Sequence, residues 1–532
     1  MNSKNQETNQ VFENVTFDEA VKRTGYGKFH AEVITVCAIS ILTVGFQNGL
    51  SSYVFPAAEC ELQLTSYHVG ILNVTFLVGG ILSSFLWGFK ADLSGRKQVI
   101  MAAHLLNFLI TVFCAVNPLY ISLFLCRFCN GFLISAPGSI IFSYLAEFQP
   151  PKYRGAIVCY CGLFFTLAWL VLPVTAYFVL PIDIHFRLGS AFILSPWRFF
   201  LIVLVVPELI VGLWFLRLPE SPKFHMTKGN KKLALNILKT MYARNTGKPE
   251  DKFPVKNLVE DAAKGEEMVS DPSTSNSGML EQFLDGMKSL FRAPLLPATL
   301  LTCFIMFSNM FGVFGLGLWL PELFIRFQKF QEMYPNASVT VKELSALSQQ
   351  KSAPSSSSCS PSFDNAVIVN TIAVACTSLV YNAVAGWLTS RVHIKTVPLV
   401  SMLLGGVSCL SIYWLTSSTQ NLIVSCIFQA TMITANMTIG SVGVELFPTS
   451  VGAIAISLIM FSGRVGAMCS NIVFGLLMDK HCEIPIFVVA VVVLLGTLLC
   501  FLIPEKEGQG HKENDYKGGE TIEISVISKD IN

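Results

Sequence analysis

Arg127, Glu208 and Arg464 are ionisable residues that lie well inside long apolar segments of this 532-residue chain. A charge among apolar residues is costly unless it meets water, an opposite charge or a ligand, so such residues are candidates for binding or ion transfer. We expect Arg464 to line a central cavity, with an ion pair between helices as the alternative. For Arg127, solute contact and a structural or coupling role are both open. For Glu208, a bond to a neighbouring helix is favoured over solute binding.

A charged segment between two apolar stretches has the pattern Gly-x-x-x-Asp-x-x-Gly-Arg-Lys and runs from Gly88 to Lys97. Its glycines, Gly88 and Gly95, permit a tight turn and a close approach of helices. Asp92 and Arg96 are placed to form charge-assisted hydrogen bonds at helix ends. The alternative, a basic loop that only anchors the chain at a membrane surface, explains the spacing less well.

One acidic residue and one glycine each recur in the chain at the same separation. Glu147 and Glu445 each precede a proline by three residues and are 298 residues apart, and Gly88 and Gly386 are separated by the same distance. Two matches at one offset indicate a duplicated six-helix unit, which is the architecture of many secondary transporters.

The motifs of common enzyme classes are missing from the sequence. It has no His-Glu-x-x-His, no Gly-x-x-x-x-Gly-Lys-Ser/Thr phosphate loop and no Gly-x-Ser-x-Gly, each of which would place catalytic or ligand-binding groups together. We therefore expect no enzyme activity, no catalytic residues, no metal site, no cofactor and no ATP-driven pumping.

The composition points to a membrane protein. Hydrophobic residues make up 52% of the chain and charged residues 14%, against about 25% charged in an average soluble domain. A net charge of +2 gives no reason to expect a nucleic-acid partner. Apolar segments long enough to span a bilayer lie near 31–56, 67–89, 98–118, 119–146, 156–181, 197–218, 295–325, 364–389, 396–416, 421–444, 452–478 and 484–504. No cleavable signal peptide is expected before the first.

We predict an all-α polytopic membrane protein with 12 transmembrane helices in two pseudo-symmetric six-helix bundles. Its expected parts are a cytoplasmic N-terminal segment (1–30), an N-terminal bundle (31–218), a cytoplasmic linker (219–294), a C-terminal bundle (295–504) with an outer loop (326–363), and a disordered cytoplasmic tail (505–532). Lys and Arg are concentrated in the short loops on the side of the N-terminus, so both termini are expected in the cytoplasm.

The polar segments carry weaker signals. The sequence from Thr16 to Glu19 is typical of a helix-capping box, and the stretch 233–242 predicts a short amphipathic helix or an ordinary solvated one. Asn336, in Asn-Ala-Ser of the outer loop, is the expected glycosylation site, because the sequons at Asn14, Asn73 and Asn436 lie inside the cell or within apolar runs. One disulfide is conceivable among the cysteines expected in outer loops, which are Cys60, Cys359 and Cys482.

These motifs resemble the major facilitator superfamily. The family's elements are matched by the sequence from Gly88 to Lys97, by Arg127-Phe128-Cys129-Asn130-Gly131, and by Glu147 followed by Arg154-Gly155. Pro219-Glu220-Ser221-Pro222-Lys223-Phe224 is similar to the signature of sugar porters and organic-ion transporters. Two further segments, 24–29 and 315–322, resemble the synaptic vesicle glycoprotein 2 branch. The resemblance implies two halves that rock about a central site.

The resemblance also implies an inner gate. It would comprise Gly88, Asp92, Gly95, Arg96, Lys97, Glu147 and Arg154, with Glu445 as the counterpart in the second half. Its second-half copy is degraded, because Ser390 and Ile394 stand where Asp and Arg would be and Val451 replaces an Arg. The first apolar run lacks the acid of related transporters and reads Val44-Gly45-Phe46-Gln47-Asn48-Gly49, so ion coupling through that helix is in doubt.

We therefore expect a secondary transporter of a small organic solute, working alone as a monomer in a plasma or vesicle membrane, with or without a coupling ion. Arg464, together with Arg127, favours an anionic or zwitterionic solute. The alternative is a non-transporting protein of the same fold that acts in vesicle trafficking or protein interaction. A channel or receptor fits the twelve spans and the repeat less well.

Overall fold

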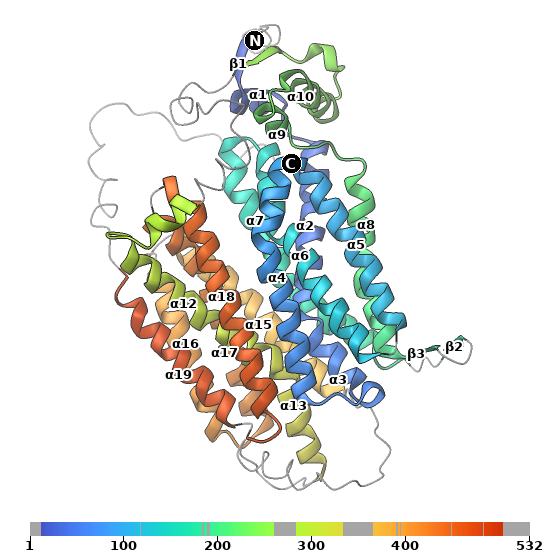
Figure 1. Ribbon diagram of the computed structural model, residues 1–532, viewed down its shortest axis with the longest axis vertical. Helices are drawn as coiled ribbons and strands as arrows, with labels where there is room; N and C mark the ends of the chain where they lie inside the picture. Colours follow the sequence, from blue (N-terminus) through green and yellow to red (C-terminus); the bar gives the residue numbers. More distant parts are fainter. Residues whose placement is uncertain are drawn as a thin grey trace, which may run out of the picture.

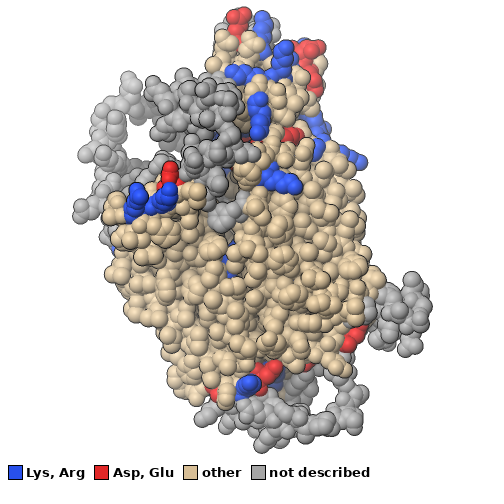
Figure 2. All heavy atoms as spheres, viewed as in Figure 1, with Lys and Arg blue, Asp and Glu red and all other residues tan. Residues whose placement is uncertain are grey.

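The computed structural model describes residues 12–117, 119–182, 186–188, 192–259, 284–333, 365–389, 392–393, 395–447, 449–481 and 483–503. Within them, 12 helical spans are long and apolar enough to cross a membrane, which confirms the predicted all-α, twelve-helix fold. Figure 1 shows two helical bundles side by side, with a small cap at the end that carries the N-terminus. We call this the cap end and the opposite end the far end. On the face shown in Figure 2, charged side chains gather at the two ends and leave a largely uncharged band between them.

The N-terminal half contains the first six spans, and two consecutive helices, α2 and α3, follow each other at the first of them. Its helices are α2 (Lys28–Gly49), α3 (Ser51–Leu62), α4 (Ser66–Ser94), α5 (Arg96–Val116), α6 (Tyr120–Phe148), α7 (Pro151–Val179) and α8 (Pro196–Phe215). Helices α2 and α3 are separated at Leu50, so α3 carries the far end of the first span. A short antiparallel hairpin, β2 (Phe186–Leu188) and β3 (Phe192–Leu194), precedes α8.

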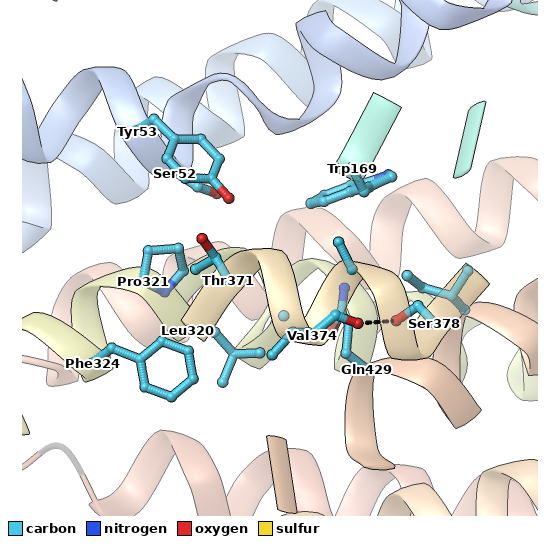
Figure 3. Close-up of a pocket in the computed structure, with 13 residues that line it drawn as sticks. Ser52, Tyr53, Trp169, Leu320, Pro321, Phe324, Thr371, Val374, Ser378 and Gln429 are labelled. Atoms are coloured by element: carbon cyan, nitrogen blue, oxygen red, sulfur yellow. Dashed lines mark hydrogen bonds between the residues drawn. The ribbon is translucent and has the colours of Figure 1, made fainter. Parts of the chain in front are cut away.

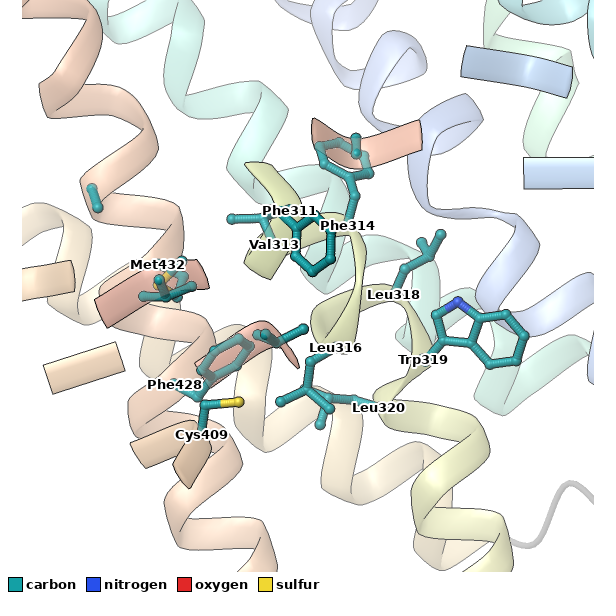
Figure 4. Close-up of a cluster of buried hydrophobic side chains, with 14 of the residues drawn as sticks. Phe311, Val313, Phe314, Leu316, Leu318, Trp319, Leu320, Cys409, Phe428 and Met432 are labelled. Carbon is teal, nitrogen blue, oxygen red and sulfur yellow. The ribbon is translucent and has the colours of Figure 1, made fainter. Parts of the chain in front are cut away.

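The C-terminal half repeats this arrangement. Its helices are α12 (Leu296–Phe314), α13 (Leu316–Met333), α15 (Asn365–Thr389), α16 (Thr396–Ser411), the 3-10 turn η3 (Ile412–Trp414), α17 (Ser418–Leu446), α18 (Thr449–Leu477) and α19 (Glu483–Cys500). The interruption falls at Gly315, between α12 and α13. Large apolar side chains pack around it, including Phe311, Phe314, Trp319 and Phe428 (Figure 4). Buried packing of this kind holds a broken helix in place within the bundle.

The cap is built from two segments that are distant in the sequence. It contains β1 (Phe12–Thr16), α1 (Phe17–Arg23), α9 (Pro222–Thr227), α10 (Lys231–Thr246), the 3-10 turn η1 (Glu250–Lys252) and β4 (Val255–Val259). Strands β1 and β4 pair in parallel, a contact the sequence did not suggest. Helix α10 is the predicted amphipathic helix, and it buries Leu238 and Met241. Helix α1 begins after Thr16 as expected, but without the predicted capping bond from the Thr16 side chain.

Several sequence predictions fall on parts of the chain that the structure does not describe. They concern the Asn336 glycan, the tail 505–532, and the side chains of Glu445, Cys60, Cys359 and Cys482. The stretch 284–290, which precedes α12, is helical.

Candidate functional site

A central cavity lies where the two halves meet. Its lining comes from α3 and α7 of the first half and from α13, α15 and α17 of the second. The polar residues of this lining are Ser52, Tyr53, Thr371, Ser378 and Gln429, and Trp169, Pro321 and Phe324 are among its larger apolar surfaces (Figure 3). The cavity measures about 40 Å³, which is room for a few water molecules. A larger solute therefore requires the halves to move apart.

The described lining of the central cavity carries no formal charge. The Ser378 hydroxyl donates to the Val374 carbonyl at 2.9 Å, so its remaining capacity is as an acceptor. Gln429 is buried, and its Oε1 has no hydrogen-bond partner. Because an unpaired buried acceptor costs free energy, this amide oxygen is a ready partner for a donor on a bound molecule.

The far end is closed by direct contacts between the halves. The Ser52 Oγ of α3 donates to the Leu318 carbonyl of α13 at 2.9 Å, just beyond the central cavity. Farther out, the Ser66 hydroxyl at the start of α4 donates to Asp479 Oδ1 at 2.6 Å. Between these bonds, α4 and α18 cross at Gly70 and Gly475. A Cβ added to Gly475 would lie 2.9 Å from Gly70 Cα, so only glycine permits this approach.

At the cap end, the predicted inner-gate residues are only partly brought together. Arg96 lies 3.3 Å from Asp92 and 3.3 Å from Glu147, and it thereby joins α4, α5 and α6. Arg154 does not join them, because it pairs instead with Asp18 of the cap at 2.8 Å. Arg96–Glu147, Arg154–Asp18 and Arg244–Glu32 are ion pairs within the first half, and Lys288–Asp285 is a pair within the segment that precedes α12.

The turn between α4 and α5 depends on Glu220, which the sequence did not single out for this role. Gly95 has a φ of +101°, and a Cβ added there would lie 2.2 Å from Glu220 Oε2. The Glu220 carboxylate accepts hydrogen bonds from the Lys97 backbone N–H at 3.0 and 3.2 Å. A carboxylate at this position also interacts favourably with the N-terminal end of the α5 dipole. The segment from Gly88 to Lys97 is thus fastened to the segment that begins at Pro219.

We expect Gly95→Ala to destabilise this turn by about 1–3 kcal/mol, because alanine disfavours a positive φ and its methyl group would displace Glu220. The apparent unfolding temperature of the purified protein should fall accordingly. Gly88→Ala is the matched control, since no atom lies within 4 Å of the added Cβ. Equal unfolding temperatures for the two variants would contradict the proposed role of Gly95.

Arg127 and Glu208 lie inside the N-terminal half and do not line the central cavity. Glu208 accepts hydrogen bonds from Asn107 Nδ2 at 2.7 Å and from Gln47 Nε2 at 2.9 Å. The Arg127 guanidinium lies 4.3 Å from the centre of the Phe76 ring, a distance typical of a cation–π contact. These contacts are with neighbouring helices of the same half, and a role of either residue in solute binding stays a prediction.

Arg464 lies at the interface between the halves, near the middle of α18. Its Nη1 donates to the Gly80 carbonyl of α4 at 2.8 Å and also contacts the Ser84 hydroxyl. The side chain is partly exposed, but it is not among the residues that line the central cavity. Its described partners are a backbone carbonyl and a hydroxyl, not the acid that the ion-pair hypothesis requires, and a role of Arg464 in solute binding stays a prediction.

Comparison with known proteins identifies the family. Residues 7–322 match the family described as "Sugar (and other) transporter", and residues 355–530 match "Major Facilitator Superfamily". The chain belongs to the sugar (and other) transporter family of the major facilitator superfamily. Members of this family are transporters rather than enzymes, so the protein is a multi-pass membrane protein of the secondary-transporter class.

Curated relatives place this transporter near one branch of the superfamily. Synaptic vesicle glycoprotein 2C of Rattus norvegicus is 23% identical over 93% of this chain and 81% of its own length. Synaptic vesicle glycoprotein 2A of Homo sapiens is 26% identical over 58% of this chain and 43% of its own length. The predicted relation to the synaptic vesicle glycoprotein 2 branch is confirmed.

Solved structures share the fold of this transporter. A D-xylose-proton symporter superimposes with a TM-score of 0.62 at 15% identity, covering 91% of this chain and 100% of that one. An inward open conformation of a xylose transporter from E. coli gives a TM-score of 0.62 at 14% identity, covering 90% of this chain and 98% of that one.

Proposed function

We propose that this transporter moves a small, uncharged, hydroxyl-bearing organic solute by alternating access, with its cap in the cytoplasm. The observation that carries the proposal is the chemistry of the central cavity. The Ser52 and Thr371 hydroxyls donate to the Leu318 and Ile368 carbonyls, so their oxygens remain as acceptors. Gln429 adds an unpartnered amide oxygen, and Trp169 offers an apolar face. Neutral acceptors beside an aromatic surface suit a polar, uncharged molecule better than an anion.

This solute differs from the anion or zwitterion favoured by the sequence. That expectation depended on Arg464, whose Nη1 is already bonded to Gly80 and Ser84 and which lies outside the cavity lining. An anion bound among neutral side chains would lose hydration without gaining an opposite charge. The unpartnered Oε1 of Gln429 needs a donor, which a solute hydroxyl supplies and a carboxylate does not.

The contacts at the two ends support a cycle in which the halves rock. With the cap in the cytoplasm, the far end faces outward and is held shut by Ser52, Ser66 and the Gly70–Gly475 crossing. We propose that the residues around Arg96 engage the second half when the protein opens outward. Ser390 and Ile394 stand in place of charged residues in the second half, so the first half supplies the greater share of the charges in this inner gate.

The test is uptake into liposomes that contain the purified protein. A radiolabelled hexose should enter, whereas labelled lactate and a labelled neutral amino acid should not. Gln429→Leu should lower hexose uptake about 10-fold or more, since it removes the buried acceptor. Gln420→Leu is the control, because Gln420 lies on the same helix α17 and is exposed.

Two results would overturn this solute class. Lactate uptake that is lost in Arg464→Ala would restore the anionic solute. Absence of flux for all three solutes, with the protein correctly inserted, would favour the non-transporting role in vesicle trafficking or protein interaction. That role is the second candidate because the relatives named above are vesicle glycoproteins.

A further inference from the structure

A second, larger cavity lies at the far end, on the other side of the Ser52–Leu318 contact from the central cavity. It measures about 480 Å³, a volume in the range of small-molecule sites. Its walls come from α3 and α4 of the first half and from α13 and α18 of the second, with Asp479 just beyond the end of α18. Ser52 lines both cavities, so the bond from its hydroxyl to Leu318 forms part of the partition between them.

The charged groups of this far-end cavity are already engaged within the protein. Arg326 is shared between Glu322 at 2.8 Å and Asp479 at 2.7 Å. It also donates to the Ser66 hydroxyl at 3.1 Å, while that hydroxyl donates to Asp479 at 2.6 Å. Glu59 has an interaction of its own as well. The charges of the lining therefore give no reason to expect an ion as the ligand.

Two neutral polar atoms of the same lining have no hydrogen-bond partner. Ser51 and Asn73 are 2% and 4% exposed, and both line the far-end cavity. Neither Ser51 Oγ nor Asn73 Oδ1 takes part in a hydrogen bond. Because a buried polar atom without a partner costs free energy, both atoms favour a molecule that supplies the missing bonds.

The bonds of Asn471 determine which atom of the Asn73 amide is left over. Asn471 Nδ2 donates to the Phe314 and Ala467 carbonyls at 3.1 and 2.9 Å. Its Oδ1 accepts the Trp319 indole N–H at 3.2 Å and the Asn73 amide N–H at 3.1 Å. An indole N–H can only donate, so reversing either amide would place like groups together. The unpaired atom of Asn73 is therefore an acceptor, and a ligand that bonds to it must carry a donor.

Apolar side chains form much of the remaining lining, and they are Phe55, Pro56, Leu64, Val69, Leu318 and Trp319. The bond from the Trp319 N–H to Asn471 holds the indole ring in place as part of this surface. A mostly apolar lining with a few placed hydrogen-bonding groups is typical of sites that bind small molecules. Aromatic rings in such a lining favour a ligand that carries a ring of its own.

We propose that the far-end cavity binds a small, uncharged molecule that combines hydroxyl groups with an apolar ring, at a site distinct from the solute site in the central cavity. One hydroxyl of the ligand donates to Asn73 Oδ1, and another bonds to Ser51 Oγ. The ring packs against Phe55 and Trp319. Because the walls come from both halves, the bound molecule stabilises the conformation in which the far end is closed. It therefore acts as an inhibitor of rocking and not as cargo.

The test is equilibrium binding of radiolabelled phenyl β-D-glucopyranoside to the full-length protein in nanodiscs of zwitterionic lipid, with empty nanodiscs subtracted. Saturable binding is expected, and methoxybenzene, which keeps the ring but has no hydroxyl, should compete poorly. Asn73→Leu preserves the size of the side chain but removes the acceptor, and it should weaken binding about 10-fold. Ser51→Ala should weaken binding about 3-fold, and its fold is expected to be unharmed, since the lost hydroxyl has no partner.

Thr75→Val is the matched control, and it should leave binding unchanged. Thr75 is buried and lies two positions from Asn73 on the same helix, but it does not line the cavity. Absence of saturable binding, equal competition by methoxybenzene, or unchanged affinity in both Asn73→Leu and Ser51→Ala would overturn the proposal. Weakening by Gln429→Leu alone would also overturn it, because the glucoside would then occupy the central cavity. Binding is measured without flux, so the result is independent of whether the solute hypothesis holds.

Discussion

Gly475→Leu is expected to open the outer side of the transporter and to abolish uptake. The new side chain would begin 2.9 Å from Gly70 Cα, and backbone cannot retreat as a flexible side chain can. Overpacking at such a contact costs about 1–3 kcal/mol. That cost falls only on the conformation in which α4 and α18 touch. The equilibrium between this conformation and the outward-open one should therefore shift about 10-fold or more toward the outward-open state.

The measurement is labelling of a Ser378→Cys reporter in the central cavity by a membrane-impermeant maleimide added outside the cell. The reporter cysteine should be labelled slowly in protein that retains Gly475 and about 10-fold faster in protein that carries Gly475→Leu. Gly452→Leu is the matched control on the same helix, since no atom lies within 4 Å of its added Cβ. Unchanged labelling in correctly inserted Gly475→Leu protein would mean that this crossing does not hold the outer side shut.

Arg198→Leu is expected to cause the largest loss of stability. Arg198 is 2% exposed, and its Nη2 lies 2.5 Å from Glu61 Oε1. Its Nη1 also donates to the Ala115 carbonyl at 2.8 Å, so one side chain ties together α3, α5 and α8. Removing one partner of a buried pair costs about 3–5 kcal/mol, and the partial exposure of Glu61 reduces this to about 2–4 kcal/mol.

The apparent unfolding temperature of purified Arg198→Leu should fall by about 5–10 °C. Arg217→Leu is the control, because Arg217 lies exposed just beyond the opposite end of α8. If the two variants unfold at the same temperature, the Arg198–Glu61 pair contributes little to stability.

The same pair predicts how stability depends on pH. Burial acts to raise the pKa of Glu61, but hydrogen bonds from Ser195, Trp197 and Arg198 outweigh it and lower that pKa below its ordinary value. A carboxyl group whose pKa is lower in the folded than in the unfolded state stabilises the fold at pH values above its unfolded-state pKa, which is about 4.3. This contribution is lost as the pH falls below 4.3 and through the folded pKa. Unfolding temperatures measured from pH 6 to pH 3 should therefore fall less steeply in Glu61→Gln than in the unaltered protein.

Spans and local motifs could be predicted from the sequence. The apolar run near 98–118 corresponds to α5, Arg96–Val116, and the run near 197–218 to α8, Pro196–Phe215. A bilayer-spanning helix satisfies its own backbone, so length and hydrophobicity alone reveal it. The proximity of Asp92 and Arg96 could also be predicted, because both residues lie within one short turn.

The break in the seventh span could not be predicted in this way. Gly315 lies in an apolar stretch, and its backbone leaves the helical conformation, with a φ of −76° and a ψ of −96°, where buried apolar side chains pack around it. For a similar reason, the sequence did not identify Gln429 as a candidate site residue. A neutral amide in an apolar helix does not by itself indicate a function. Only the structure shows that the amide oxygen of Gln429 has no partner and that the residue lines a cavity.

By itself, the sequence determined what is local: twelve helices, the duplicated halves, the family and the charged turn from Gly88 to Lys97. Only the tertiary structure decided which distant groups meet. Glu220 fastens that turn from 123 positions beyond Lys97, and Arg464 of α18 meets the Gly80 carbonyl of α4. Hydrophobic burial depends on composition along the chain, whereas hydrogen bonds and ion pairs depend on distance and direction in space, which packing alone sets.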